Sequence, residues 1–407
     1  MKLRCTQAAL KRGLDAVSLA VAEKSSLPVL ANVLLSTDHH ELRLAATNLE
    51  IRVTHWLEAE VETHGAITVP ARLLSEIVNT LPKDTLVLER LPHGEMLHLT
   101  VGPFTNRLCG IEADSFPRQP TPGDLAIATT MPASVLREAL SQVIFATAKV
   151  DTRPILTGVM FEIGAHDIRL AAADTYRLAV RRVPLTQAGE AHTVVVPTWA
   201  CTSLIRILHD CESEISIAVN PDATHVFFHT ATSEVVSRLI DGRYPDINRV
   251  IPGPGSTQAI VDAEALFHTV RLATYFTSGD AYPLPLQLAI CAAPQGETHG
   301  QVMIQVASPT GNNRSRLQAQ VEGPDAALGL NASFLTDILR ANRSGWLRIA
   351  LHGPDGPSVF CPETLHGEQI HVVMPIPLSS STSTKSPSVA TPPPAQTPAP
   401  SDEDDAA

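Results

Sequence analysis

One strand-like phrase occurs three times in this chain: Leu42-Arg43-Leu44-Ala45-Ala46-Thr47-Asn48, then Ile168-Arg169-Leu170-Ala171-Ala172-Ala173-Asp174, and finally Val302-Met303-Ile304-Gln305-Val306-Ala307-Ser308. A Pro-aliphatic phrase precedes each copy, at Pro28-Val29-Leu30, Pro154-Ile155-Leu156 and Pro283-Leu284. The three prolines are separated by nearly equal intervals, as expected for a long-period internal repeat. The chain is therefore predicted to consist of three copies of one module.

A helical pattern lies ahead of each Pro-aliphatic phrase. Apolar residues recur at helical spacing in the first two modules, at Leu10, Leu14, Val17 and Val21, and at Val135, Leu136, Ala139, Leu140, Val143 and Ile144. A shorter third pattern begins with Leu266, Val270 and Ala273. This spacing puts the apolar side chains on one face of a helix, so each module is expected to start with an amphipathic helix.

A second helix is expected later in each module, directly after a short strand. The strands end at Pro70, Pro197 and Asn331, and apolar residues at helical spacing follow: Leu73, Leu74, Ile77 and Val78; Leu204, Ile205 and Leu208; Phe334, Leu335, Ile338 and Leu339. Proline suits the first helical position, and asparagine suits the N-cap. Because β-rich stretches separate only two helices per module, the pattern favours an α+β fold with antiparallel sheets.

Composition marks the boundaries between these modules. Pro-rich linkers lie at Pro117-Arg118-Gln119-Pro120-Thr121-Pro122-Gly123 and at Pro252-Gly253-Pro254-Gly255. The modules are predicted to span residues 1–122, 123–253 and 254–378. Residues 379–407 are rich in Ser, Thr and Pro and contain the acidic run Asp402-Glu403-Asp404-Asp405. This segment cannot bury enough apolar surface to offset its ordering entropy, so it is expected to be disordered.

The bulk composition is that of a globular protein, with 44% hydrophobic and 18% charged residues among 407. Lys11, Arg12 and Asp15 interrupt any apolar run near the N-terminus, and no stretch reaches the ~18 apolar residues of a membrane span, so a cytoplasmic location is expected. The formal net charge of −12 excludes a uniformly basic coat for nucleic acid. It permits a basic lining inside an acidic exterior.

The reactive residue types form no recognisable metal or cofactor motif. The six cysteines show neither CxxC pairing nor the spacing of a zinc site, and they are expected to be small buried residues: Cys5, Cys109, Cys201, Cys211, Cys291 and Cys361. Acid/base chemistry could use Asp174 with Tyr176, His209 with Asp210, or His39 with His40, but no HExxH, GxSxG, P-loop or GxGxxG motif accompanies them. His39-His40 is predicted to form a hairpin turn. An enzyme of unknown reaction is the alternative from another class.

Five phrases resemble, in order, those of the bacterial sliding clamp family, the β subunit of DNA polymerase III. They are Ala45-Ala46-Thr47-Asn48-Leu49-Glu50, Arg153-Pro154-Ile155-Leu156-Thr157-Gly158-Val159, Ala173-Asp174-Thr175-Tyr176-Arg177-Leu178-Ala179-Val180, Asp241-Gly242-Arg243-Tyr244-Pro245-Asp246 with Arg249-Val250-Ile251-Pro252, and Val372-Val373-Met374-Pro375-Ile376-Pro377-Leu378. The resemblance covers the chain up to Leu378. It implies a head-to-tail homodimeric ring of three clamp modules per chain, with helices lining the hole and sheets outside.

The resemblance also implies a non-enzymatic function and a set of partners. The ring would encircle double-stranded DNA as the processivity factor of the replicative polymerase. It would recruit the polymerase III α subunit, the clamp loader, and other polymerases and repair proteins through short peptide motifs. An alternative is a clamp-fold paralogue that acts as an adaptor or a drug-tolerant duplicate. Approximate dimer contacts are Leu108 on one side and Leu272 with Ala273 on the other.

A clamp that slides needs cations facing phosphates rather than side chains reading bases. Basic residues recur at equivalent positions of the repeated helices, where Arg12 matches Arg137, Lys24 matches Lys149, and Arg206 matches Arg340. The proposed DNA-facing residues are Lys24, Arg72, Lys149, Arg153 and Arg206, with Arg12, Arg137 and Arg340 as weaker candidates. The alternative is that these are ordinary solvated helix charges.

The second site that the resemblance implies is an apolar peptide-binding groove between the second and third modules. Its matching residues are Leu156, Thr175, Tyr176, Arg177, Leu178, Pro252, Pro357, Val359, Val372, Met374, Pro375 and Leu378. Met and aliphatic side chains repack easily and so suit several partners. Two features depart from the family pattern: Pro377 replaces a residue that is often basic, and the chain continues past Leu378.

Overall fold

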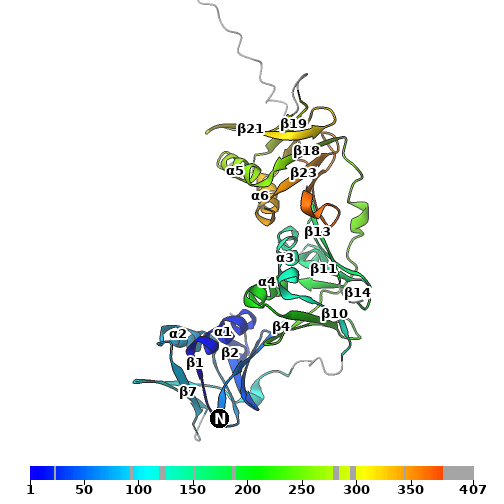
Figure 1. Ribbon diagram of the computed structural model, residues 1–407. Helices are drawn as coiled ribbons and strands as arrows, with labels where there is room; N and C mark the ends of the chain where they lie inside the picture. Colours follow the sequence, from blue (N-terminus) through cyan, green and yellow to red (C-terminus); the bar gives the residue numbers. More distant parts are fainter. Residues whose placement is uncertain are drawn as a thin grey trace, which may run out of the picture.

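The computed structural model describes residues 1–22, 24–91, 95–118, 125–150, 152–185, 189–277, 284–293, 299–342 and 345–378. The predicted tail at 379–407, part of the first linker and Pro283 lie outside the described residues. Residues 1–122, 123–253 and 254–378 are called modules 1, 2 and 3. The modules follow one another along a crescent, with the N-terminus in the module at the bottom of Figure 1.

Module 1 alternates strands with two helices: β1 (Lys2–Thr6), α1 (Gln7–Val17), β2 (Asn32–Asp38), β3 (Glu41–Thr47), β4 (Ile51–Glu58), β5 (Glu60–Thr63), β6 (Ala66–Pro70), α2 (Ala71–Thr80), β7 (Thr85–Arg90), β8 (Met96–Val101) and β9 (Phe104–Cys109). Short 3-10 turns η1 (Ser18–Ala20) and η2 (Pro28–Ala31) lie between α1 and β2. The first Pro-aliphatic phrase therefore forms a 3-10 turn at the entrance to a strand.

Modules 2 and 3 repeat this order. Module 2 contains β10 (Ile127–Pro132), α3 (Ala133–Ser141), η4 (Ile144–Ala146), η5 (Pro154–Thr157), β11 (Gly158–Ile163), β12 (Asp167–Ala173), β13 (Arg177–Pro184), β14 (His192–Pro197), α4 (Thr198–Ile207), η6 (Leu208–Asp210), β15 (Glu214–Val219), β16 (His225–His229), β17 (Ser233–Arg238) and η7 (Ile247–Arg249). Module 3 contains β18 (Thr257–Asp262), α5 (Ala263–Thr274), β19 (Leu286–Cys291), β20 (Gly300–Ser308), β21 (Gly311–Glu322), β22 (Ala326–Leu330), α6 (Ala332–Ala341), β23 (Trp346–Leu351), β24 (Ser358–Pro362) and β25 (Gln369–Val373).

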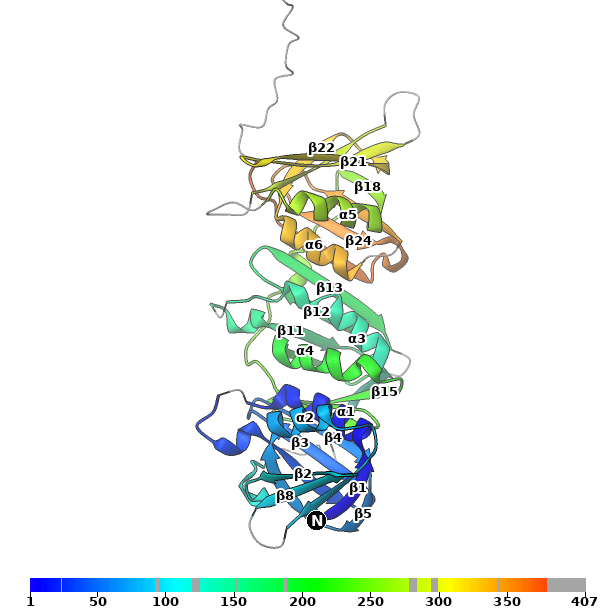
Figure 2. The ribbon, with the colours of Figure 1, turned by 90° about the vertical axis from the view of Figure 1, so that its left-hand side faces the viewer.

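The helices gather on one side of the crescent. In Figure 1 they lie on the concave side, and Figure 2, which faces that side, shows α1 to α6 in front of the sheets. Each helix buries an apolar stripe against its sheets; α1 buries Leu10, Leu14 and Val17. Gly13 allows the close approach, because a Cβ there would lie 2.7 Å from Leu44 Cδ1. The polar faces of the helices are thus left to line the concave surface.

The helix boundaries correct several expectations. The first helix ends at Val17, and Val21 follows the 3-10 turn η1 instead of extending the helix. Val143 and Ile144 likewise lie beyond α3, which ends at Ser141. The first helix of module 3, expected to be shorter, is the longest among the described residues, at 12 residues. Pro70 and Pro197 occupy the N-cap rather than the first helical position. Asn331 is an N-cap as predicted, and its side chain accepts from Ser333 N at 2.9 Å.

Sheets cross both module boundaries. At the first boundary β4 pairs antiparallel with β17, and Val53 lies opposite Val235. At the second boundary β13 pairs antiparallel with β25, and Arg177 lies opposite Val373. In the described part of the chain, an 8-stranded and a 12-stranded sheet therefore each span two modules. Backbone hydrogen bonds, as well as side-chain packing, hold the crescent together.

Modules 1 and 2 share one hydrophobic core, whereas module 3 has a separate one. One continuous cluster contains core residues of modules 1 and 2, such as Leu44 and Phe161. Module 3 has its own cluster, which includes Leu288 and Phe360. No helix among the described residues is long and apolar enough to cross a membrane.

Candidate functional site

The strongest cation candidates are exposed and lack a described acidic partner. Lys24, Lys149, Arg153 and Arg206 are all exposed, and none forms an ion pair with a carboxylate of a described residue. Arg72 is also exposed, but its Nε lies 2.9 Å from Glu76 Oε1 one helical turn away. The charge of Arg72 is therefore partly compensated, whereas the other four are available to an anion.

The weaker candidates are less uniform. Arg12 and Arg340 are exposed, whereas Arg137 is half-buried and its Nη1 donates to the His209 carbonyl at 3.4 Å. The structure adds Arg271, which was not among the predicted residues. Arg206, Arg271 and Arg340 occupy the last turns of α4, α5 and α6. Cations are favoured there by the helix dipole as well as by any ligand, so the repeated position alone does not establish DNA contact.

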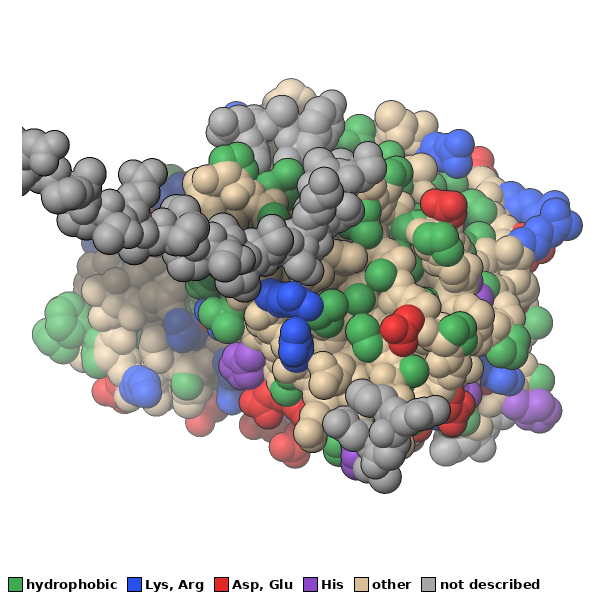
Figure 3. All heavy atoms as spheres, turned by 90° about the horizontal axis from the view of Figure 1, so that it is seen from above, with side chains coloured by type: hydrophobic (Ala, Val, Ile, Leu, Met, Phe, Trp, Pro, Cys, Tyr) green, Lys and Arg blue, Asp and Glu red, His purple; other side chains and the backbone are tan. Residues whose placement is uncertain are grey.

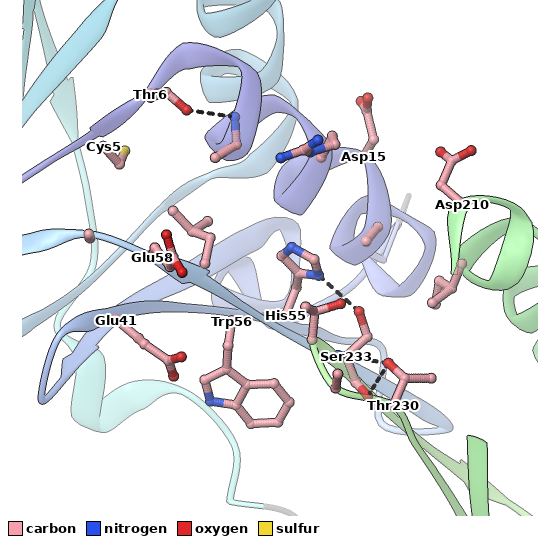
Figure 4. A pocket seen from close by; sticks show the side chains of 18 of the residues that line it. Cys5, Thr6, Asp15, Glu41, His55, Trp56, Glu58, Asp210, Thr230 and Ser233 are labelled. Atoms are coloured by element: carbon pink, nitrogen blue, oxygen red, sulfur yellow. Dashed lines mark hydrogen bonds between the residues drawn. The ribbon is translucent and has the colours of Figure 1, made fainter. Parts of the chain in front are cut away.

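A cavity of about 1440 Å³ lies at the boundary of modules 1 and 2, between α1 and the end of α4. Figure 4 shows Thr6 at the start of α1, Asp15 on α1, His55 on β4 and Asp210 of η6 around this space. His55 Nδ1 lies 2.9 Å from Ser233 Oγ across the boundary. Burial, with a smaller effect of Arg12, lowers the pKa of His55 to about 4. His55 is thus a neutral hydrogen-bonding group at the boundary.

The pairs considered for acid/base chemistry have structural explanations. Asp174 Oδ1 accepts from the backbone N–H groups of Tyr176 and Arg177, which closes the turn between β12 and β13. His209 and Asp210 lie in the exposed turn η6. His39 and His40 form the turn between β2 and β3, as predicted. No cluster of metal-ligating side chains occurs among the residues that the structure describes.

Arg177 lies inside the boundary between modules 2 and 3, with only 6% of its surface exposed. Its guanidinium contacts Asp174 at 3.0 Å and Asp337 of α6 at 2.8 Å, and it also donates to the Phe145 carbonyl. The Phe334 ring centroid is 4.4 Å from its Cζ. Arg177 was expected to line a groove, but these contacts make it a buried link between the modules.

An apolar cluster lies on the opposite face of β13 from Arg177, because adjacent strand residues such as Arg177 and Leu178 point to opposite faces. It brings together four of the predicted groove residues: Leu156, Leu178, Val359 and Val372. Sequence reasoning did not assign the other main members to the groove: Met160, Ala171, Val180, Val195, Tyr244 and Ile247. Tyr244 and Ile247 come from the segment between β17 and β18, and the phrase Asp241–Asp246 was the signal that could have identified Tyr244. Burial raises the pKa of the Tyr244 hydroxyl.

The rim of this cluster carries exposed side chains. Tyr176 is 61% exposed and Met374 is 42% exposed, and the backbone N–H of Met374 donates to the Tyr176 carbonyl at 2.8 Å. Thr175 is also exposed, while Pro252, Pro357 and Pro375 are half-buried. We call the exposed rim and the cluster beneath it the Tyr176–Met374 surface.

The last predicted groove residue lies elsewhere. Ile376 N donates to the Gly329 carbonyl of β22 at 2.8 Å, which carries the chain along the edge of module 3. Leu378 packs over Gly329, where a Cβ would come within 3.0 Å of Leu378 Cδ2. Leu378 is therefore placed on β22, and these contacts do not link it to the Tyr176–Met374 surface.

Two strands have an open edge at the ends of the crescent. β9 ends the 5-stranded sheet of module 1. The first part of β21 in module 3 pairs with β20 only, whereas its last part, from Gln320 to Glu322, also pairs with β18. Of the predicted dimer contacts, Leu272 is 55% exposed, but Leu108 and Ala273 are buried in the cores of their own modules. The Leu108 and Ala273 side chains point inward and offer little surface to a partner, and the contact of these residues with a second copy stays a prediction.

Comparisons with known proteins agree with this architecture. The model for the N-terminal domain of the DNA polymerase III beta subunit matches residues 1–117, and the model for the central domain matches residues 130–246. The beta sliding clamp of Synechococcus elongatus is 32% identical over 384 residues, which cover 93% of this chain and 100% of the relative.

Solved structures give the same result for the fold. The DNA polymerase sliding clamp from Bacillus subtilis superposes with a TM-score of 0.85 at 23% identity, covering 93% of this chain and 100% of that one. A sliding clamp from Pseudomonas aeruginosa, solved bound to griselimycin, superposes with a TM-score of 0.82 at 26% identity over the same shares.

Three α+β modules with their helices on one concave face thus define a protein with the sliding-clamp fold. The chain belongs to the family of the DNA polymerase III beta subunit, the bacterial beta sliding clamp.

Proposed function

We propose that two copies of this chain join head to tail into a closed ring around duplex DNA, and that the ring serves as the non-enzymatic processivity factor of the replicative polymerase. This role places the protein in the cytoplasm with the chromosome. The observation that carries the proposal is the internal repeat of strand pairing. β4 pairs with β17, and β13 pairs with β25, so the next pair in the series joins β21 of one copy to β9 of another.

The repeat also predicts the register of that joint. In the β3–β4 hairpin Val53 lies opposite Ala46, and in the equivalent β20–β21 hairpin Asn313 lies opposite Val306. Asn313 is therefore the counterpart of Val53. In the β16–β17 hairpin Val235 lies opposite Phe228, and in the equivalent β8–β9 hairpin Asn106 lies opposite Leu99. Asn106 is therefore the counterpart of Val235. Since Val53 lies opposite Val235 across the internal boundary, Asn313 is expected opposite Asn106 of the partner copy. Both asparagines are half-buried on the inward face of their strands, which suits this pairing.

The edges that would join are largely uncharged. From β9 the joint would use Thr105, Asn106 and Arg107, and from β21 it would use Asn312, Asn313 and Arg314. Figure 3, which looks down on the end formed by module 3, shows mainly uncharged side chains and backbone there. Polar edges of this kind can be solvated when apart, which lets the joint open without exposing a large apolar surface.

DNA would be held by topology and by weak contacts. Lys24, Lys149, Arg153 and Arg206 supply uncompensated cations for phosphates, with Arg72 as a lesser contributor because of Glu76. Phosphate contacts carry no sequence information and release counterions, so they permit sliding and weaken as salt increases. The net charge of −12 opposes nonspecific binding of DNA to the rest of the surface.

Partners would bind at the Tyr176–Met374 surface. An exposed tyrosine and methionine over an aliphatic cluster suit short apolar peptides, because methionine adapts its shape and tyrosine supplies a rigid anchor. We propose that the polymerase III α subunit, the clamp loader, and other polymerases and repair proteins compete for it. Griselimycin, which is bound in the Pseudomonas aeruginosa clamp structure, is a suitable probe for competition.

The test compares retention on circular and linear DNA. The protein is loaded with its cognate clamp loader, and bound protein is measured after gel filtration at moderate salt. A ring should stay on nicked circular DNA and leave within the time of the column once the circle is cut. Equal retention on both forms, or a monomer in solution at working concentration, would contradict the proposal.

A further inference from the structure

A second, smaller cavity lies on the concave side between modules 1 and 2. Its volume is about 510 Å³, and it is formed by Leu19 of η1 together with residues of α4 and of the loop after η4. The side chains that matter here are Lys149, Thr198, Trp199 and Arg206. Figure 2 shows that α4 belongs to the row of helices on the concave face. The cavity therefore opens toward the space proposed to hold DNA.

Trp199 is the unusual member of this group. It lies in the first turn of α4 and is 39% exposed, although α4 already buries Ala200, Cys201 and Leu204 in the core. Packing of the helix therefore does not require an indole at this position. An exposed tryptophan presents a broad apolar face together with one N–H donor, which makes it suitable for stacking on a flat ligand.

The start of α4 holds this tryptophan in place. Thr198 Oγ1 donates to the Thr157 carbonyl, which ties the helix to η5. Ser203 Oγ donates to the Trp199 carbonyl at 3.0 Å from one turn further along. Both hydroxyls are used within the protein, so the indole and the cations are the groups left to a ligand.

Two cations line the same cavity as the indole. Lys149 and Arg206 are exposed, and no carboxylate of a described residue pairs with either. Arg206 lies seven residues after Trp199, about two helical turns along the same side of α4. An aromatic face that shares a cavity with two uncompensated positive charges is complementary to a chain that alternates flat bases with phosphates.

We propose that this cavity binds an unpaired base of single-stranded DNA, with the base stacked on Trp199 and the neighbouring phosphates held by Lys149 and Arg206. The inference rests on the proposed function, because a ring around duplex DNA brings the single strand beyond the duplex end close to its inner face. Lys149 and Arg206 then serve both kinds of strand, whereas Trp199 serves only the unpaired one. Base stacking is tolerant of sequence, which is compatible with movement along DNA.

The experiment uses the intrinsic fluorescence of Trp199 in the full chain, in solution and without loading. The chain has 3 tryptophans, so the variant W56F/W346F leaves Trp199 as the sole emitter. An oligothymidylate of about 10 nucleotides should quench its emission saturably, and an abasic oligonucleotide of the same length should quench it far less. If W56F/W346F fails to fold, the difference in emission between wild type and W199F gives the same signal.

Affinity for a labelled oligothymidylate gives the second measurement. W199A should weaken binding about tenfold or more. W346A is the matched control, because Trp346 is exposed on β23 of module 3 and away from the cavity. No saturable quenching, equal quenching by the abasic strand, or quenching by a short apolar peptide instead would overturn the proposal. Failure of the ring to stay on circular DNA would refute the proposed function without changing this signal.

Discussion

Val53 of module 1 and Val235 of module 2 lie directly opposite each other across the first module boundary, and both are buried. Backbone bonds from Trp56 N to Thr232 O and from Arg238 N to Glu50 O bracket this pair, so it occupies a non-hydrogen-bonded position of the ladder. Side chains are closest at such positions. The equivalent pair at the proposed joint between copies is Asn106 with Asn313.

A disulfide tests this register. With Cys109 replaced by Ser to remove an exposed thiol, N106C/N313C should form a covalent dimer under mild oxidation, because cysteines at a non-hydrogen-bonded pair reach the required separation. N106C/N312C is the matched control, since neighbouring strand residues point to opposite faces. Nonreducing electrophoresis measures both, and equal cross-linking would contradict the predicted pairing.

The polarity of the joint leads to a second prediction. N106V/N313V imitates the internal boundary and should tighten the dimer by about 2 kcal/mol, since two more aliphatic side chains are buried. Sedimentation across a dilution series should show the midpoint of dissociation falling by more than tenfold. N312V, on the exposed face of β21, is the control and should have little effect. A dimer weakened by N106V/N313V would show that the asparagines do not meet.

Arg177 should contribute to the stability of modules 2 and 3. R177A leaves Asp174 and Asp337 without their cation, and unfolding should become easier by about 2 kcal/mol. This value is below that of a fully buried pair, because the Asp337 side chain is 29% exposed and its charge is partly solvated. Denaturant unfolding measures the change. R182A removes an exposed arginine of the same strand and should change stability much less.

His371 should make the protein sensitive to acid. Complete burial lowers its pKa from 6.5 to about 3, so the folded state keeps it neutral while the unfolded state takes up a proton below pH 6.5. Stability is therefore lost as the pH falls from 6.5 toward 3, by up to about 1.4 kcal/mol per pH unit. H371Q should flatten this dependence in unfolding measured against pH. H209Q, at an exposed histidine, should not.

The cations of the concave face should differ in their effect on DNA. Charge reversal of Lys24, Lys149 and Arg206 together should reduce loading while the dimer stays intact, because these residues lack described acidic partners. Substituting each one by Gln should lower the salt dependence of DNA affinity by roughly one ion. R72Q should have a smaller effect, since Glu76 already compensates that charge. Unchanged loading after the triple reversal would refute the assignment.

The sequence was most informative where local pattern determines structure. The repeated phrase around Leu44 and Leu170 lies on central strands of equivalent sheets, and its apolar periodicity predicted three α+β modules. Asn331 was identified as an N-cap because capping depends on adjacent backbone groups. Helix lengths were less accurate, as α5 shows, because the end of a helix depends on packing as well as on periodicity.

Features that depend on distant contacts were not predictable in this way. Arg177 is polar and follows an exposed turn, and nothing in its neighbourhood indicates that Asp337, 160 positions later, will cover it. Tyr244 joins Leu156 and Leu178 only because the segment after β17 folds back over module 2. The pairing of β4 with β17 and the cavity beside Trp199 likewise arise from the way modules stack.

The strand edges at the two ends of the crescent differ from each other, and this has a geometric consequence. When copies join through two unlike surfaces, each open chain of copies has one unused surface at either end. The chain becomes a ring if its last copy meets its first, and otherwise the same contact builds a filament. The curvature of one copy between β9 and β21 determines how many copies are needed to close a ring. In the proposed ring, the curvature that the continuous sheets hold would determine the number of copies, and the chemistry of the joint would determine only its strength.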